Sequence, residues 1–122
     1  MFLKTEVRKM RVDIPSIKVS YTKNNLEFVK EVIYGIEEEG IPYEITEEEF
    51  SDVIKKAYEE SFNSSLSFGI ALNDEKAAFH FSKLEEEKPL FLVNIKSMDK
   101  KDLRAYGSNA ARLIKGIPFK EV

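Results

Sequence analysis

The 122-residue sequence contains no cysteine, a single histidine, only five glycines and no long apolar run. Without cysteine the chain has neither a disulfide framework nor a thiolate metal site. No stretch approaches the roughly 20 apolar residues that a membrane span needs. The first residues, MFLKTEVRKMRVDIP, are too charged for the apolar core of a signal peptide. We therefore expect a cytoplasmic protein without a membrane partner.

Recognisable catalytic motifs are also missing. The five glycines are scattered, no Gly-Lys-Ser/Thr occurs, and Gly-x-Ser-x-Gly is absent, which argues against a phosphate-binding loop and a nucleophile elbow. His80 lies between Phe79 and Phe81. A catalytic histidine normally has an orienting partner, so we expect this one to be packed. The residues alone give no indication of an enzyme.

The net charge of −3 is unevenly distributed along the chain. Residues 27–60 carry a net charge of −9, whereas residues 88–122 carry +5. Separate acidic and basic segments favour a protein partner with complementary patches over nucleic acid, which needs a dominant basic face. The alternative is that both segments are simply hydrated surface.

Apolar periodicity predicts one α/β domain over residues 15–122, after an N-terminal extension of residues 1–14. Helices are expected at 26–40, from about 50 after a capping box of Thr46 and Glu49, and at 99–115. Strands are expected at 17–21, 41–45, 66–72, 77–81 and 90–95, the last one buried. This order favours a parallel sheet covered on both faces, made mixed by an antiparallel hairpin over 66–81.

One face of the first predicted helix carries an acidic stripe. At about 100° per residue, Glu27, Glu31, Tyr34 and Glu38 lie together opposite the apolar stripe. Such carboxylates repel one another, so a divalent cation or a basic partner surface would stabilise them; the alternative is a well-hydrated face. Gly35 is disfavoured by about 1 kcal/mol relative to Ala within a helix, which indicates close approach of another backbone or a bulky side chain.

The last predicted helix contains small residues in the segment YGSNAARLIKGIPF, residues 106–119. Its spacing predicts a core face made of Leu103, Tyr106, Ala110, Leu113 and Ile114, and places Asn109 and Arg112 off that face. Asn can bond loop backbone, and Arg can bind a carboxylate with two hydrogen bonds. These two residues either face a partner or pin the C-terminal hook to the domain.

Four segments, taken together, resemble the small subunit of the diol/glycerol dehydratase reactivating factor. They are YGIEEEGIPYEI (34–45), FGIAL (68–72), KPLF (88–91) and GSNAARLIKGIPF (107–119), and the resemblance covers about residues 15–120. It implies a three-layer α/β/α fold with a mixed five-stranded sheet of order 2-1-3-4-5, the fourth strand antiparallel. It also implies a chain with no catalytic activity and no cofactor bound alone.

The same resemblance implies partners and a mechanism. A large ATPase subunit carries ATP and magnesium and forms a heterotetramer with the small subunit. The client is an adenosylcobalamin-dependent dehydratase, whose medium subunit takes the place of the small subunit so that damaged cobalamin is released. Glu38 corresponds to the middle glutamate of the run, which contributes to a divalent-metal site shared with the large subunit. The expected interface residues are Glu27, Glu31, Tyr34, Glu38, Asn109 and Arg112.

Three alternatives remain at this stage. The segment before Ile17 is longer and more basic than the pattern, and medium subunits of the dehydratase share much of the motif set. The chain could thus be a medium-subunit-like dehydratase component that contacts cobalamin. It could also be a stand-alone paralogue with another client, or a small-molecule-binding domain. Whether the client acts on glycerol or a diol, and whether a bacterial microcompartment houses the protein, is left open.

Overall fold

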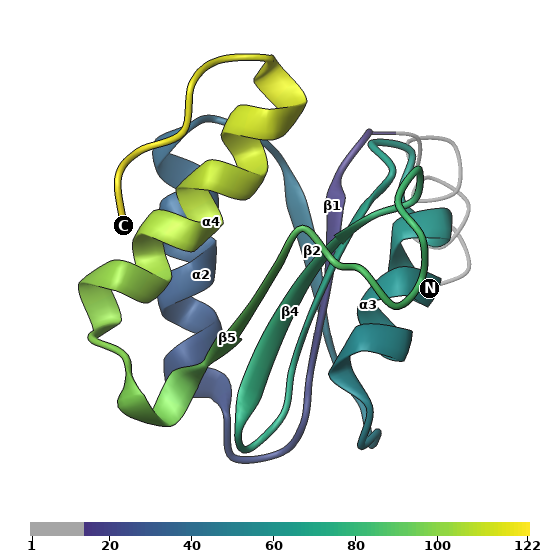
Figure 1. Cartoon of the computed structure of the whole chain (residues 1–122), viewed down its shortest axis with the longest axis vertical. Helices are drawn as coiled ribbons and strands as arrows, with labels where there is room; N and C mark the ends of the chain where they lie inside the picture. Colours follow the sequence, from purple (N-terminus) through teal and green to yellow (C-terminus); the bar gives the residue numbers. More distant parts are fainter. Residues whose placement is uncertain (1–13) are drawn as a thin grey trace, which may run out of the picture.

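One mixed sheet and three α-helices make up the computed structural model, which describes residues 14–122 (Figure 1). The elements follow the predicted order. They are β1 (Ile17–Tyr21), α2 (Leu26–Glu38), β2 (Tyr43–Glu47), α3 (Val53–Asn63), β3 (Phe68–Leu72), β4 (Lys76–Phe81), β5 (Phe91–Asn94), the short 3-10 helix η1 (Ile95–Ser97) and α4 (Lys100–Lys115).

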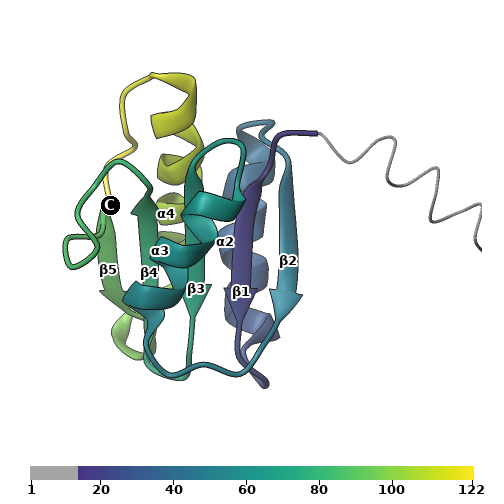
Figure 2. The same cartoon turned by 90° about the vertical axis from the view of Figure 1, so that its right-hand side faces the viewer.

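The sheet has the order β2-β1-β3-β4-β5. β1 pairs in parallel with β2 and β3, whereas β4 is antiparallel to both of its neighbours. Helices α2 and α4 pack side by side on one face, and α3 covers the other face (Figures 1 and 2). The expected three-layer fold, the strand order and the antiparallel fourth strand are therefore confirmed.

The two sides of the sheet differ in how much they bury. On the side of α2 and α4, large side chains such as Phe68, Ile70 and Phe79 are fully buried in the main core. Beneath α3 the sheet presents small residues, including Gly69 and Ala71, to the backbone of that helix. The asymmetry follows from the strand alternation, which sends successive side chains to opposite faces.

Helices α2 and α4 lie so close together that their backbones are in contact. A Cβ atom at Gly35 would lie 2.0 Å from the carbonyl oxygen of Arg104, and one at Gly107 would lie 2.1 Å from that of Val32. The Ser108 hydroxyl donates a hydrogen bond of 3.1 Å to the carbonyl of Gly35. The close approach predicted from Gly35 is confirmed, and its neighbour is α4.

Two local predictions are wrong. Thr46 and Glu49 do not cap a helix, because Thr46 lies in β2 and α3 begins at Val53, where the Asp52 carboxylate accepts a hydrogen bond from the backbone N–H of Lys55 at 3.1 Å. The β-branched Ile and Thr at 45–46 favour the strand over the cap. The last strand is at the sheet edge, so it is only partly buried, and Leu92 is 43% exposed.

The predicted N-terminal extension of residues 1–14 falls almost wholly on residues 1–13, which lie outside the described residues, as do most of the residues used to argue against a signal peptide. Ile14, the first described residue, is exposed. Within residues 14–122, no helix has the length and apolar character needed to cross a membrane.

Candidate functional site

The acidic stripe of α2 faces a matching basic series on α4. Glu27 pairs with Lys100 at 2.5 Å, and Glu31 pairs with Arg104 at 3.0 Å. Each pair joins residues 73 positions apart, because α2 and α4 run side by side with a constant offset. Much of the repulsion predicted along the stripe is therefore offset within the chain itself.

The pair between Glu27 and Lys100 is exposed to solvent. The ion pair and hydrogen bond with Lys100 lower the pKa of Glu27, and the same contacts with Glu27 raise the pKa of Lys100. Exposed pairs of this kind contribute little to stability and weaken further as the salt concentration rises. Arg104 also lies over the ring of Tyr34, 5.4 Å from the ring centroid, so this half-exposed tyrosine supports the guanidinium.

Glu38 closes the stripe at the C-terminal end of α2. One of its oxygens, Oε2, lies 3.8 Å from an Arg104 guanidinium nitrogen. The other, Oε1, lies 3.3 Å from the Lys120 ammonium and accepts a hydrogen bond of 3.4 Å from Ser108. The side chain is nevertheless 42% exposed. Glu38 is thus a carboxylate at the surface that is contacted by two cations and one hydroxyl group of its own chain.

Glu39 forms a second, more buried charge cluster that sequence reasoning missed. Its carboxylate, 8% exposed, pairs with Arg112 at 2.9 Å and with Lys115 at 3.1 Å. Burial by itself raises the pKa of Glu39, but the hydrogen bonds and charges of Arg112 and Lys115 outweigh it and lower the pKa overall. The sequence did offer one signal for this cluster. Arg112 and Lys115 are three positions apart, and residues at that spacing share a helix face.

The C-terminal segment is tied to α4 by two residues of the predicted interface. The Asn109 side chain accepts a hydrogen bond from the backbone N–H of Lys120 at 2.6 Å and donates one to its carbonyl at 3.0 Å. Arg112 donates to the carbonyl of Pro118 at 3.1 Å. Asn109 is nevertheless buried, 2% exposed, and its side chain bonds the segment that follows α4. The contacts expected to hold the C-terminal hook to the domain are therefore present. A contact of Asn109 or Arg112 with a partner stays a prediction.

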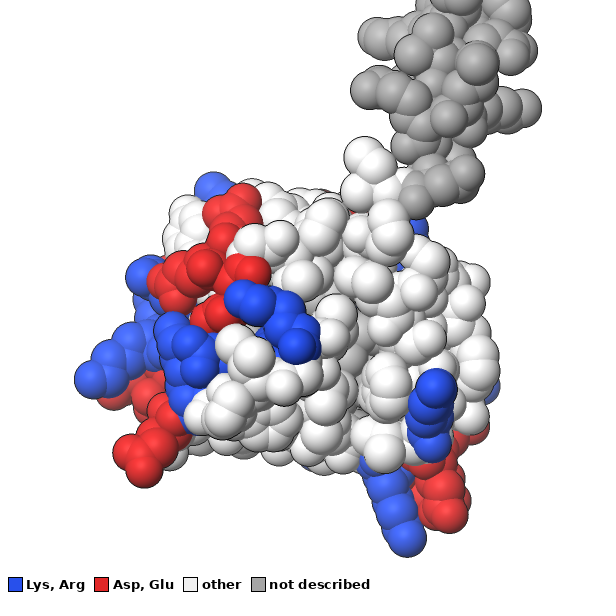
Figure 3. Space-filling view, turned by 90° about the horizontal axis from the view of Figure 1, so that it is seen from above, with Lys and Arg blue, Asp and Glu red and all other residues white. Residues whose placement is uncertain are grey.

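On the face seen from above, charged side chains form a large group on the left and a smaller group at the lower right (Figure 3). Viewed from above, acidic and basic atoms intermix over the α2 and α4 layer, beside a broad area without charged side chains (Figure 3). The ion pairs of Glu38 and Glu39 with α4 and the C-terminal segment belong to this layer. The six predicted interface residues therefore come from two helices that form one continuous layer, although Asn109 lies beneath its surface.

The fit of this site to a divalent cation is partial. Mg²⁺ prefers six oxygen ligands and keeps several waters, bound through one or two carboxylates. Within residues 14–122, no group of three or more potential acidic or histidine ligands is brought together. Glu38 itself is one exposed carboxylate flanked by Arg104 and Lys120, so the metal role expected for it stays a prediction.

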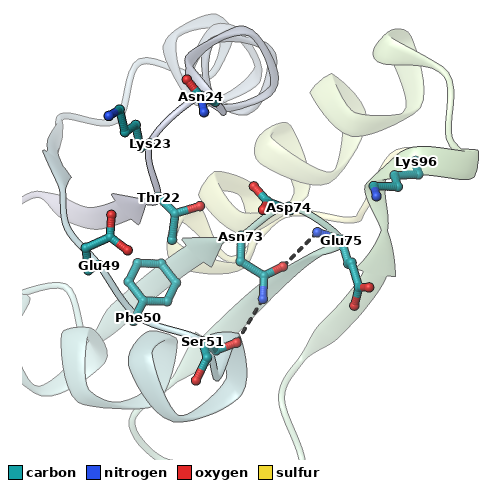
Figure 4. Close-up of a pocket in the computed structure, with 10 residues that line it drawn as sticks. All are labelled: Thr22, Lys23, Asn24, Glu49, Phe50, Ser51, Asn73, Asp74, Glu75 and Lys96. Atoms are coloured by element: carbon teal, nitrogen blue, oxygen red, sulfur yellow. Dashed lines mark hydrogen bonds between the residues drawn. The ribbon is translucent and has the colours of Figure 1, made fainter.

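A polar cavity lies away from Glu38, at the end of the sheet where the parallel strands β1, β2 and β3 end (Figure 4). It has a volume of about 670 Å³ and is lined by residues that follow these strands, among them Thr22, Glu49 and Asn73. Asn73 bonds the carbonyl of Ser51 at 2.8 Å and the backbone N–H of Glu75 at 2.9 Å. These contacts hold the surrounding loops to one another.

His80, the single histidine, is packed as expected. Its ring is fully buried beside Tyr58, with centroids 5.0 Å apart, and Nε2 lies 2.8 Å from the carbonyl of Glu86. Among residues 14–122 no carboxylate bonds the ring, and the contact with Glu86 ties the β4–β5 connection to the sheet.

Comparisons with known proteins agree over nearly the whole described chain. The family model for the dehydratase medium subunit matches residues 14–120. The propanediol dehydratase-reactivating factor small subunit of Citrobacter freundii is 40% identical over 107 residues, 88% of this chain and 91% of the relative. The protein of the same name from Salmonella typhimurium is 34% identical over 108 residues, 88% and 92% of the two chains.

A solved structure extends the similarity to three dimensions. A chain in the structure of diol dehydratase-reactivating factor complexed with ADP and Mg²⁺ has a TM-score of 0.83 and 34% identity to this chain. The match covers 88% of this chain and 98% of that chain. Sequence and fold thus both match chains of reactivating factors over 88% of this chain.

Proposed function

This chain belongs to the dehydratase medium subunit family and matches reactivating factor small subunits along almost their full length, and from that premise we propose how it acts. Its role is that of an accessory small subunit in a dehydratase-reactivating factor. The observation that carries this role is the coverage of 91% of the Citrobacter freundii relative at 40% identity. A medium-subunit-like dehydratase component that contacts cobalamin is the less supported alternative.

The partner is a large subunit that binds nucleotide and magnesium. The similar solved factor was complexed with ADP and Mg²⁺. This chain has no phosphate-binding loop in its sequence, and its described residues bring together no three-ligand metal cluster. ATP hydrolysis is accordingly assigned to the large subunit, with the two kinds of subunit forming a heterotetramer.

The docking surface is the charged layer formed by α2 and α4. It presents Glu38 at its end, and the exposed parts of Glu27, Arg104 and Tyr34 along its length. Surface charges of both signs suit a reversible interface, because they steer association and add little to the affinity of each contact. Glu38 is the carboxylate offered to a divalent cation shared with the large subunit.

Reactivation follows from subunit exchange. The small subunit leaves the large subunit, and the medium subunit of an adenosylcobalamin-dependent diol or glycerol dehydratase takes its place. The shared family membership of this chain with dehydratase medium subunits supports the replacement, because two chains of one fold can present similar surfaces to the same partner. The opened dehydratase then releases damaged cobalamin.

The test uses a dehydratase whose bound cobalamin has lost its adenosyl group. The purified complex of this chain with the large subunit is expected to restore activity when ATP, Mg²⁺ and fresh adenosylcobalamin are added. The large subunit alone, and this chain alone, serve as matched controls. Restoration by the large subunit alone at the full rate would contradict a role for this chain.

A further inference from the structure

β2 forms one edge of the sheet, and among residues 14–122 only its inner side is paired with a strand. Just after β2, the backbone N–H of Glu48 donates a hydrogen bond of 3.0 Å to the carbonyl of Tyr21 in β1. Because residues of a strand alternate in the side to which their N–H and C=O groups point, the even-numbered residues face β1. The backbone groups of Tyr43, Ile45 and Glu47 therefore point to the outer side.

The outer edge of β2 has the features of a surface that pairs with another strand. Its register with β1 runs over five consecutive residue pairs without a bulge, and the strand YEITE contains no proline. The side chain of Ile45 is 40% exposed. The other edge strand, β5, differs because its Phe91 ring packs against Phe119 of the C-terminal segment, with centroids 5.5 Å apart. Natural proteins usually cover an open edge or interrupt it, which points to an occupant for β2.

The charge of this edge indicates the kind of occupant. Glu44 and Glu47 lie in β2, and Glu48 and Glu49 follow directly. Glu44 and Glu48 each pair with a lysine, whereas Glu47 and Glu49 have no ion pair within residues 14–122. Two copies of β2 paired with each other would bring like charges together, which is destabilising. The edge therefore fits an extended basic segment better than a second copy of itself.

Residues 1–13 of the chain have the matching composition. They carry four cations and two carboxylates, which gives a net charge of +2, and none of them is proline or glycine. The β-branched types that suit strands recur within them. The cations are Lys4, Arg8, Lys9 and Arg11, and the β-branched residues are Thr5, Val7 and Val12.

The described chain also begins at the right place. Ile17, the first residue of β1, lies opposite Tyr43, the first residue of β2. Residues 14–16 lead from the start of β1 toward the side of β2 (Figure 2). Three extended residues span about 10 Å, which equals the roughly two strand spacings from β1 to the outer side of β2. The residues before Ile14 can thus reach the start of this edge and are long enough to follow all of β2.

We propose that residues 4–12 pair with the outer edge of β2 as a sixth strand, antiparallel to it. Their backbone bonds the outward groups of Tyr43, Ile45 and Glu47, and their cations offset the carboxylates at the end of β2. The added strand closes the edge and keeps copies of the chain from pairing through it. This inference does not rest on the proposed function, because it concerns no residue of the charged layer of α2 and α4.

Amide hydrogen exchange of the full chain, resolved by NMR, tests the pairing. The amides of Tyr43, Ile45 and Glu47 should exchange about tenfold more slowly in the unsubstituted chain than in the double variant Val7→Pro, Met10→Pro, as expected for an edge covered about nine-tenths of the time. Proline has no N–H, and one of the two positions faces β2 whichever set of residues points inward.

The amides of Glu44 and Thr46 are the internal control, because they bond β1 and should exchange equally in both proteins. Unchanged exchange of these two amides also shows that the double proline variant keeps its sheet.

A charge variant tests the complementarity separately. Arg8→Glu combined with Arg11→Glu should speed exchange of the outward amides, because the segment then repels the acidic edge. Lys83→Glu combined with Lys101→Glu makes the same charge change at exposed positions on other elements and should leave these amides unchanged.

Equal exchange of the outward amides in the unsubstituted chain and the double proline variant would overturn the proposal. Protection that increases with protein concentration would assign the edge to a second copy and would overturn it as well. A failure to bind the large subunit would count against the proposed function alone, since the amide comparison uses the isolated chain.

Discussion

Replacing Gly35 with alanine should separate the two helices that present the candidate interface. The added Cβ would lie 2.0 Å from the carbonyl oxygen of Arg104 and 2.7 Å from the backbone nitrogen of Ser108. Both are backbone atoms, so no side-chain rotation relieves the contact. Helix α4 must shift away from α2, and the paired charges on the two helices must shift with it.

The size of the effect follows from two opposing terms. Overpacking a close contact costs about 1–3 kcal/mol, and two backbone contacts place Gly35→Ala at the upper end. Alanine is about 1 kcal/mol better than glycine within a helix, which offsets part of this. The free energy of unfolding should fall by about 2 kcal/mol, which lowers Tm by about 8–10 °C for a domain of this size.

Thermal unfolding followed by circular dichroism measures this change. Gly40→Ala is the matched control, because a Cβ there meets no atom within 4 Å and the substitution tests only the left-handed φ of 76°. That strain costs about 1–2 kcal/mol. A Tm for Gly35→Ala equal to or above that of the unsubstituted protein would refute close helix contact as the reason for this glycine.

Four further outcomes are expected. Glu38→Gln should weaken binding to the large subunit at least about fivefold in Mg²⁺, measured by calorimetry; an unchanged Kd with and without Mg²⁺ would remove Glu38 from the interface. Arg112→Ala should lower the free energy of unfolding by about 1–2 kcal/mol in chemical denaturation, because the buried Glu39 loses one partner; a loss of affinity without a loss of stability would instead place Arg112 at the interface. Since the pKa of Glu39 is lowered from 4.5, its stabilisation is fully present above that value and is lost as the pH falls through the lower folded-state pKa, so the Tm gap between the unsubstituted protein and Glu39→Gln should shrink in acid; a constant gap would contradict this. Finally, adding adenosylcobalamin to the isolated chain should leave the cobalamin absorption spectrum unchanged, whereas a shift would favour the alternative of a cobalamin-contacting component.

Much of the fold could be predicted because its signals are local. Apolar spacing located α2 and α4, and alternating residues located β1 and the β3–β4 hairpin. The boundaries of β2 and α3 were wrong because Thr46, read as a helix cap, lies inside β2, and Glu49 falls in the connection between Glu47 and Val53. A capping motif predicts the start of a helix only where the preceding strand has already ended.

The site could be predicted in part. Glu27, Glu31 and Glu38 were placed on one face from helical geometry, and that face is where they lie. Their intramolecular partners were not foreseen, because the pairing of Lys100 and Arg104 with α2 depends on which helices become neighbours on the sheet. Tertiary pairing of this kind has no signature within either helix.

The buried position of Asn109 illustrates the same limit. Helical spacing placed it off the core face, where it could bond loop backbone or face a partner. In the fold it is buried, and the backbone of Lys120, in the segment that follows α4, makes two hydrogen bonds with it. A segment that follows the helix thus decides which of its faces is buried, and the sequence of the helix alone does not contain that information.

Native mass spectrometry of this chain co-expressed with its large reactivase subunit tests whether the chain is an exchangeable accessory subunit. One complex with two copies of each subunit is expected, and added dehydratase medium subunit should displace this chain from it. A chain that stays alone in the presence of the large subunit, or that assembles with dehydratase subunits in its place, would contradict the proposed function.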